Sequence, residues 1–150
     1  MSYSTVEAAV QTVLQKLTRF ADSEITRGDY RILDAIRTDC IVLTPGSFGE
    51  TQRISESVYR AWDVLADLFY CYLDDGSSWT DFATSRDAVI NQLEQYPTLD
   101  NTLGITGIEV SAADDIQEVY SDDGAGPFFL MQRLRVTILE RYDLTGGEFA

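Results

Sequence analysis

The chain has 150 residues, a length that predicts one domain, and 45% of them are hydrophobic, which suffices for a packed core and excludes global disorder. It carries 25 acidic and 11 basic residues and no histidine, for a net charge of −14. Non-specific binding to nucleic acid or to an anionic membrane needs clustered cations, so this balance argues against both. Since the sequence shows neither an apolar run of about 20 residues nor a secretory signal, we expect a soluble protein made in a cytoplasm.

An amphipathic helix is predicted over residues 5–20. Ser4 and Glu7 have the spacing of a capping box, in which each side chain bonds to the other residue's backbone N–H. Apolar residues then recur every three or four positions, as on the buried face of a helix: Val6, Val10, Val13, Leu14, Leu17 and Phe20.

The next stretch predicts a turn and a short strand. Gly28 is a turn signal, but residues 23–39 otherwise settle on no single period. Residues 40–44 are rich in β-formers and are followed by Pro45 and Gly46, a pair typical of a turn. We therefore expect the strand to stop there and residues 47–51 to form a loop.

Residues 55–73 fit a helical stripe as well as an alternating strand. Aromatic and β-branched residues dominate residues 62–72, which favours a strand there. Its two faces would be Trp62, Val64, Ala66, Leu68, Tyr70 and Tyr72 on one side, and Asp63, Leu65, Asp67, Phe69 and Cys71 on the other. Residues 55–61 stay open between helix and strand.

A second helix is predicted after a turn at residues 74–78. It begins at a cap on Ser78 or Thr80, and Pro97 ends it. Its buried side is marked by Phe82, Val89, Ile90, Leu93 and Tyr96.

Two shorter strand segments follow this helix. Residues 103–110 contain Gly104 and Gly107 and predict a kinked or bulged strand. Residues 116–120 predict its continuation or a neighbouring strand. An acidic hairpin loop is expected over residues 121–126.

The final strand, residues 126–143, has the clearest pattern. Leu130, Leu134, Val136 and Ile138 fall on one parity, and Arg133, Arg135, Thr137 and Arg141 fall on the other. A period of two places these sets on opposite faces of a strand, one in the core and one polar. Residues 144–150 are expected to be a mobile tail.

The order helix, strand, strand, helix, strand, strand predicts an α+β fold. We expect an antiparallel or mixed sheet of about four strands, flanked by two main helices. Residues 1–150 would form this single domain, with the short mobile tail starting at about residue 144.

The residue types offer little for catalysis. Without histidine, the commonest general base and metal ligand is missing, and no phosphate-binding glycine motif is present. Cys40 and Cys71 are expected to be reduced, with no histidine to activate either thiol. Paired aspartates at 74–75, 114–115 and 122–123 lack the spacing of a calcium loop. We therefore predict no enzyme activity, no catalytic residue, no cofactor and no metal site.

The arginines of the final strand have two equally weighted interpretations. They form cross-strand ion pairs with acids such as Asp63 or Asp67, or they bind carboxylates across an interface with another copy of the chain. Phe48, on a glycine-flanked segment, is either an exposed apolar anchor or folds back onto the sheet. The candidate protein–protein interface residues are Phe48, Arg53, Arg60, Asp63, Asp67, Asp122, Asp123, Arg133, Arg135 and Arg141.

The order and spacing of these elements resemble the tail terminator (tail completion) proteins of long-tailed bacteriophages. The resemblance spans most of the chain. It is carried by the capped N-terminal helix, by Gly28-Asp29-Tyr30-Arg31-Ile32-Leu33 leading to Ile41-Val42-Leu43-Thr44-Pro45-Gly46-Ser47-Phe48, by the strand at 62–72, by Gln95-Tyr96-Pro97-Thr98-Leu99 and by the closing strand at 127–142.

This resemblance implies a structural protein without an active site. It implies a ring, usually of six copies, that caps the finished tail tube, ends its polymerisation and docks onto the head or neck. The implied partners are further copies of the chain, the tail tube protein and the head–tail connector or neck protein, with no membrane. DNA would pass through the ring without specific binding, and the protein would lie at the head-proximal end of the virion tail after assembly in the host cytoplasm.

Two alternatives remain beside this interpretation. One is another neck or head-completion protein with the same architecture. The other is an acidic DNA mimic that inhibits a nucleic-acid enzyme, although the acids are scattered over turns and helices rather than along one surface.

Overall fold

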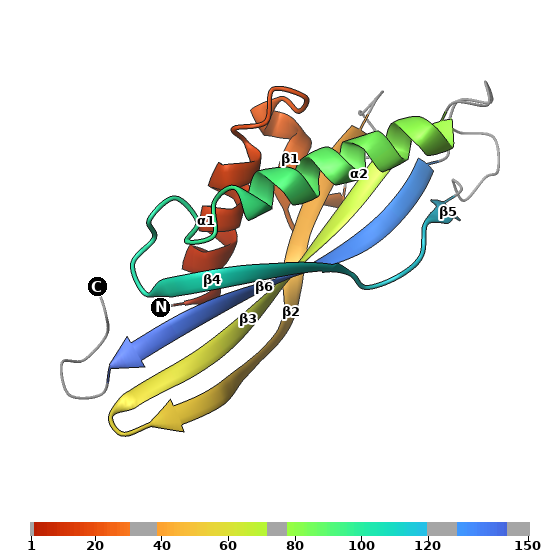
Figure 1. Cartoon of the computed structure of the whole chain (residues 1–150). Helices are drawn as coiled ribbons and strands as arrows, with labels where there is room; N and C mark the ends of the chain where they lie inside the picture. The colour runs from red at the N-terminus through yellow and green to blue at the C-terminus, as the bar shows by residue number, and fades with distance from the viewer. Residues whose placement is uncertain (1, 31–38, 72–77, 120–128, 144–150) are drawn as a thin grey trace.

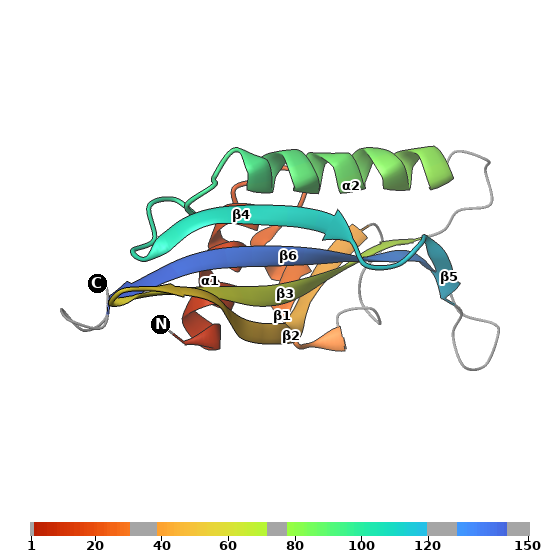
Figure 2. The same ribbon diagram turned by 60° about the horizontal axis from the view of Figure 1, so that its bottom comes forward.

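The computed structural model describes residues 2–30, 39–71, 78–119 and 129–143. Its elements are α1 (Tyr3–Leu14), the 3₁₀ turn η1 (Asp22–Glu24), β1 (Ile25–Arg27), β2 (Asp39–Ile54), β3 (Ser57–Cys71), α2 (Ser78–Glu94), β4 (Ile105–Ala112), β5 (Gln117–Val119) and β6 (Phe129–Asp143). Both helices lie on the same face of a strongly twisted sheet (Figure 1, Figure 2). The strand order is β1-β2-β3-β6-β4, and β5 also pairs with β6.

The α+β architecture is as predicted, but the sheet is larger than expected. It has six strands instead of about four. It is mixed, because β1 runs parallel to β2 whereas the other pairs are antiparallel. The strand β1 was not predicted, because three residues are too few to show a period.

Helix α1 begins and ends earlier than its apolar pattern predicts. Ser2 is the N-cap and its side chain accepts a hydrogen bond from the Thr5 backbone N–H at 3.3 Å, so the predicted Ser4–Glu7 capping box is wrong. The helix ends at Leu14, yet Phe20 still packs into the core from the segment that follows. Apolar spacing therefore identified buried residues beyond the true helix end.

The predicted turn at Pro45 and Gly46 is wrong, since β2 continues through both residues. A register shift between Pro45 and Phe48 marks a bulge, and a bulge on an edge accommodates a proline that cannot donate to the ladder. A Cβ added to Gly46 would lie 2.8 Å from the Cβ of Asp63. Glycine is therefore needed for a close approach of β2 to β3, and residues 47–51 belong to the strand instead of a loop.

The strand interpretation of residues 62–72 is confirmed for its described part. β3 also includes residues 57–61, which had stayed open, and Ser55 takes a positive φ of 55° in the turn that joins β2 to β3. Trp62, Val64, Ala66 and Leu68 lie in the main core, and Asp63 and Asp67 lie on the opposite face.

The C-terminal half follows its prediction closely. Helix α2 starts at Ser78, and it buries Phe82, Val89 and Leu93. A register shift between Ile105 and Gly107 confirms the bulged strand, and Gly104 has a positive φ of 87° just before it. Strand β6 pairs along its whole length with β3 on one side, and with β4 and β5 on the other.

The main core fills the space between the helices and the sheet. It joins Val6, Val10 and Leu14 of α1 and Phe82, Val89 and Leu93 of α2 to Ile41, Leu43, Val64, Ala66, Leu130, Leu134, Val136 and Ile138 of the sheet. Neither described helix is long and apolar enough to cross a membrane. The loop predicted at 121–126 and the tail at 144–150 lie outside the described residues, as does the turn predicted at 74–78 except for Ser78, which begins α2.

Candidate functional site

The structure divides the predicted interface residues into two groups. Asp63, Asp67, Arg133, Arg135 and Arg141 lie on the face of the sheet that is opposite the helices, here called the helix-free face. Phe48, Arg53 and Arg60 lie at the end of the sheet formed by the β2–β3 hairpin. Asp122 and Asp123 lie outside the described residues.

Asp67 and Arg133 form the central ion pair of the helix-free face. They are directly opposite each other on β3 and β6, and the guanidinium binds the carboxylate through Nε–Oδ1 at 2.7 Å and Nη2–Oδ2 at 3.1 Å. The Tyr30 hydroxyl donates to Oδ2 of the same carboxylate at 2.5 Å. Hydrogen bonding to Asp67 raises the pKa of the Arg133 guanidinium, which stays charged. Arg133 is therefore engaged within its own chain by the cross-strand pairing that was one of its two interpretations.

Asp63 organises a second polar group on the same face. Its Oδ1 accepts a hydrogen bond from the Thr137 hydroxyl at 2.7 Å, and its Oδ2 accepts one from the Ser47 hydroxyl at 2.6 Å. Arg135 Nε lies 3.7 Å from Oδ2, which is an ion pair without a hydrogen bond, and the Arg135 side chain is 49% exposed. Arg135 is thus held more loosely than Arg133.

Arg141 lies near the hairpin end of the helix-free face. Its side chain is exposed and donates from Nη2 to the Ser57 hydroxyl at 3.4 Å. Its backbone N–H donates to the carbonyl of Gly104 at 2.9 Å, which holds the segment before β4 beside the end of the sheet.

Phe48 combines both behaviours that the sequence allowed. It is 55% exposed, yet its ring centroid lies 4.2 Å from that of Trp62. Trp62 is fixed in turn, because its Nε1–H donates to Glu140 at 3.1 Å. Arg60 Nη1 lies 3.8 Å from Oε1 of the same carboxylate, and Arg60 Cζ lies 4.4 Å from the centroid of the Tyr142 ring. The hairpin therefore presents Phe48 on a rigid support.

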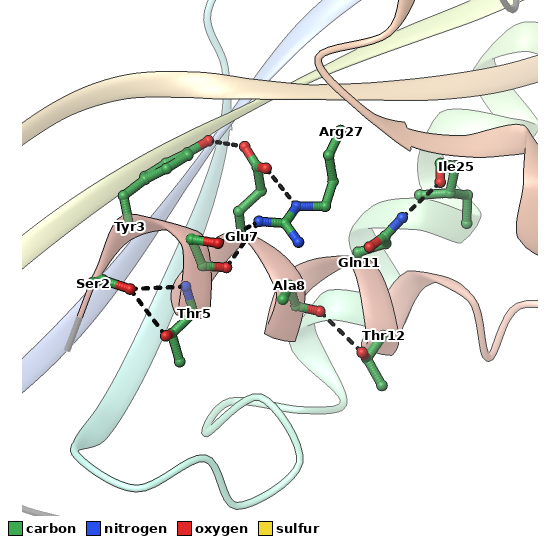
Figure 3. A network of polar contacts seen from close by, with 10 residues as sticks. Ser2, Tyr3, Thr5, Glu7, Ala8, Gln11, Thr12, Ile25 and Arg27 are labelled. Atoms are coloured by element: carbon green, nitrogen blue, oxygen red, sulfur yellow. Dashed lines mark hydrogen bonds and ion pairs between the residues drawn. The ribbon is translucent and has the colours of Figure 1, made fainter.

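A further polar network, not predicted from the sequence, joins α1 to β1 (Figure 3). Buried Glu7 accepts a hydrogen bond from Arg27 Nε at 2.6 Å and another from the Tyr3 hydroxyl. Burial raises the pKa of Tyr3, as does the bond to Glu7. Arg27 also donates to the Ser4 carbonyl at 3.1 Å. The available sequence signal was that Glu7 falls on the apolar stripe of the helix, where a carboxylate needs a cation.

Glu7 is one of four buried carboxylates among the described residues, and each lies beside an arginine. The pairs are Glu7–Arg27 at 2.6 Å, Asp39–Arg19 at 2.9 Å, Asp67–Arg133 at 2.7 Å and Glu140–Arg60 at 3.8 Å. A charge is buried at acceptable cost when it is paired and hydrogen-bonded. Asp39 is further satisfied by the Ser85 hydroxyl at 2.8 Å.

Other basic residues also form ion pairs within the chain, but with carboxylates that are more exposed. Among the described basic residues, ion pairs within the chain are made by Lys16, Arg19, Arg27, Arg53, Arg60, Arg86, Arg133 and Arg135. They are distributed over the segment that follows α1, the sheet and α2. The excess of negative charge is consequently left on the outside of the molecule.

Side chains that could hold a metal ion do not cluster among the described residues. Within them, no three His, Cys, Asp or Glu side chains gather as a possible metal site, and no buried side-chain nitrogen or oxygen lacks a partner. Burial raises the pKa of the Cys40 thiol to about 12, helped by Asp39 and Glu24, so this thiol is a poor nucleophile at neutral pH.

No protein-family model matches the chain, and no curated protein matches it either. What the chain does is therefore inferred from its residues and their arrangement.

Proposed function

We propose that the chain is a structural component of a long-tailed bacteriophage, a tail terminator that assembles as a ring. The ring caps the tail tube, ends its polymerisation and joins the tail to the head or neck. The observation that carries this proposal is the division of charge, with most cations paired inside the chain and the acidic excess outside.

This division of charge suits a channel for DNA. A surface that binds DNA exposes clustered lysine and arginine, which release counterions from the phosphates. Here four arginines neutralise buried carboxylates instead. A ring of such chains has an acidic wall, past which a polyanion slides without being held.

The sheet supplies a rigid body for contacts between copies. A head-to-tail interface closes into a ring when its rotation permits. On the helix-free face, the Arg135 side chain is 49% exposed and is held only by a 3.7 Å ion pair to Asp63, so a carboxylate of an adjacent copy would reach it and help to set the register between copies. The further partners of the ring are the tail tube protein on one side and a connector or neck protein on the other.

The distribution of acidic residues does not support the alternative function, a DNA mimic. A mimic needs its carboxylates along one surface at phosphate-like spacing, whereas four of the acids here are buried and paired with arginine. Titration into a basic DNA-binding enzyme separates the two functions. Inhibition that salt abolishes would support mimicry, and its absence would favour the virion role.

Electron microscopy of the purified protein in negative stain tests the proposal directly. We expect closed rings with a central hole, and a matching mass by light scattering. Adding tail tube protein should give tubes capped at one end, which distinguishes a tail terminator from another neck protein. A strict monomer with and without the tube protein would contradict the proposal.

A further inference from the structure

The β2–β3 hairpin extends beyond the part of the sheet that the helices cover. Figure 1 shows its turn and the end of β6 continuing past both α1 and α2. The projecting hairpin is defined here as residues 45–61. Nearly every residue of its first strand is exposed, in contrast to the five buried residues at the start of β2.

Three of the exposed large apolar side chains lie at this end of the molecule. Among the described residues, five large hydrophobic side chains are exposed, and Phe48 at 55%, Ile54 at 53% and Leu103 at 62% are three of them. Phe48 and Ile54 belong to the projecting hairpin, where the register places Phe48 on the face of Trp62 and Ile54 on the opposite face, beside Ser57. Leu103 lies across β6 from the hairpin, because Arg141 of β6 donates to the Gly104 carbonyl on one side and is opposite Tyr59 of the hairpin on the other.

The side chain of Phe48 is ordered by its contact with Trp62 although it is exposed. Its ring rests on Trp62, which is buried and hydrogen-bonded to Glu140. A contact residue that is already ordered loses little side-chain entropy on binding, and aromatic anchors of this kind dominate many interfaces. Phe48 therefore has the properties of an interface anchor.

The projecting hairpin also differs in charge from the rest of the chain. It contains two acids, Glu50 and Glu56, and two arginines, Arg53 and Arg60, so its net charge is zero in a chain of net charge −14. Two copies of an acidic chain repel each other over most of their surface. The repulsion is least where one copy contributes a neutral apolar element.

From these observations we infer that the projecting hairpin is a contact surface between copies of the chain, with Phe48 as its anchor. Its occupant is a second copy, which receives the hairpin on a surface outside its own hairpin. A contact of this head-to-tail kind generates a ring. The inference rests on the proposed ring and names the element that builds it.

Three variants and the wild-type protein test the inference by light scattering over a range of concentrations. Phe48→Ser and Ile54→Ser remove apolar side chains from the projecting hairpin. Trp79→Ser is the matched control, because Trp79 is 42% exposed but lies on α2. Circular dichroism verifies that each variant folds.

We expect Phe48→Ser to raise the concentration needed for assembly by about tenfold or more, and Ile54→Ser to raise it by less. Trp79→Ser should assemble as the wild type does. If the wild type forms rings and both hairpin variants assemble unchanged, the hairpin inference is overturned while the ring proposal stands. If the wild type is a monomer at every concentration, the ring and the hairpin contact both fail.

Discussion

Strands β2 and β3 cross two different environments along their length. At the helix-covered end, Ile41, Leu43, Val64 and Ala66 are fully buried beneath α1 and α2. At the hairpin end, residues 45–54 are almost all exposed, and cross-strand pairing with a few aromatic contacts supports the strands. One pair of strands thus anchors the fold at one end and offers a surface for contacts at the other.

Phenylalanine removal gives the largest expected contrast between the two ends. Phe82→Ala should lower the free energy of unfolding by about 4 kcal/mol, because Phe82 is 1% exposed and its loss leaves a cavity under α2. Phe48→Ala should lower it by about 1 kcal/mol or less, since mainly the contact with Trp62 is lost. Urea denaturation at low protein concentration measures both values, and equal losses would remove the distinction between the ends.

Charge removal should show the same contrast on a smaller scale. Asp67→Asn should lower the free energy of unfolding by about 2 kcal/mol, because it removes the buried carboxylate charge that binds both the Arg133 guanidinium and the Tyr30 hydroxyl. The full penalty is not expected, since Arg133 is about one third exposed and water screens its charge.

Glu50→Gln is the matched control for Asp67→Asn. The pair between Glu50 and Arg53 is exposed, so its loss should change the free energy of unfolding by less than about 0.5 kcal/mol. A loss at Glu50 as large as that at Asp67 would show that the hairpin depends on its ion pair for stability.

Two glycines of β2 sharpen the comparison within the hairpin itself. Gly46→Ala should cost about 1–2 kcal/mol, because its new Cβ would lie 2.8 Å from the Cβ of Asp63. Gly49→Ala should be neutral or slightly stabilising, because nothing lies within 4 Å of the added atom. Thermal unfolding of the two variants gives the difference, and a tolerant Gly46 would mean that β2 shifts easily against β3.

A further effect concerns alkaline pH and the core rather than the hairpin. Burial raises the pKa of Cys40 to about 12, so the folded protein keeps a proton that the unfolded chain loses near pH 8.5. This contribution to stability is complete below about pH 8.5 and declines as the pH rises toward 12. Denaturation at several alkaline pH values should show a shallower decline for Cys40→Ala. Part of the decline should remain, because the pKa values of Tyr3 and Tyr30 are also raised by burial.

Elements with a strong local pattern were predicted well from the sequence. The alternation along β6 assigned its core face, with Leu130, Leu134, Val136 and Ile138 buried as expected. Composition alone assigned β3, and the glycines near residues 104–107 indicated the bulge of β4. These predictions held because a side chain's face follows directly from the period of its own element.

Elements that depend on distant residues were missed or misjudged. β1 has three residues and exists through its parallel pairing with β2. The pair Pro45-Gly46 is typical of a turn, but both residues lie within β2, because a bulge in its pairing with β3 accommodates them. The Ser4–Glu7 spacing was a valid capping pattern, yet Arg27 from β1 binds the Glu7 side chain.

The candidate site was predicted in part for the same reason. Asp67 and Arg133 were recognised as possible partners, because parity placed both on polar faces. Their register, which makes them directly opposite, depends on how β3 pairs with β6. The contact between Phe48 and Trp62 likewise required β2 to continue past Pro45, which local turn chemistry argues against.

By itself, the sequence determined the α+β class, the acidic excess, and which face of each long element is apolar, since these follow from composition and from periods of 3.6 and 2. The tertiary structure alone decided which arginine neutralises which buried carboxylate and which end of the sheet the helices leave uncovered. Both depend on strand register and helix placement. These are set by contacts between residues far apart in the chain, which a local sequence pattern does not specify.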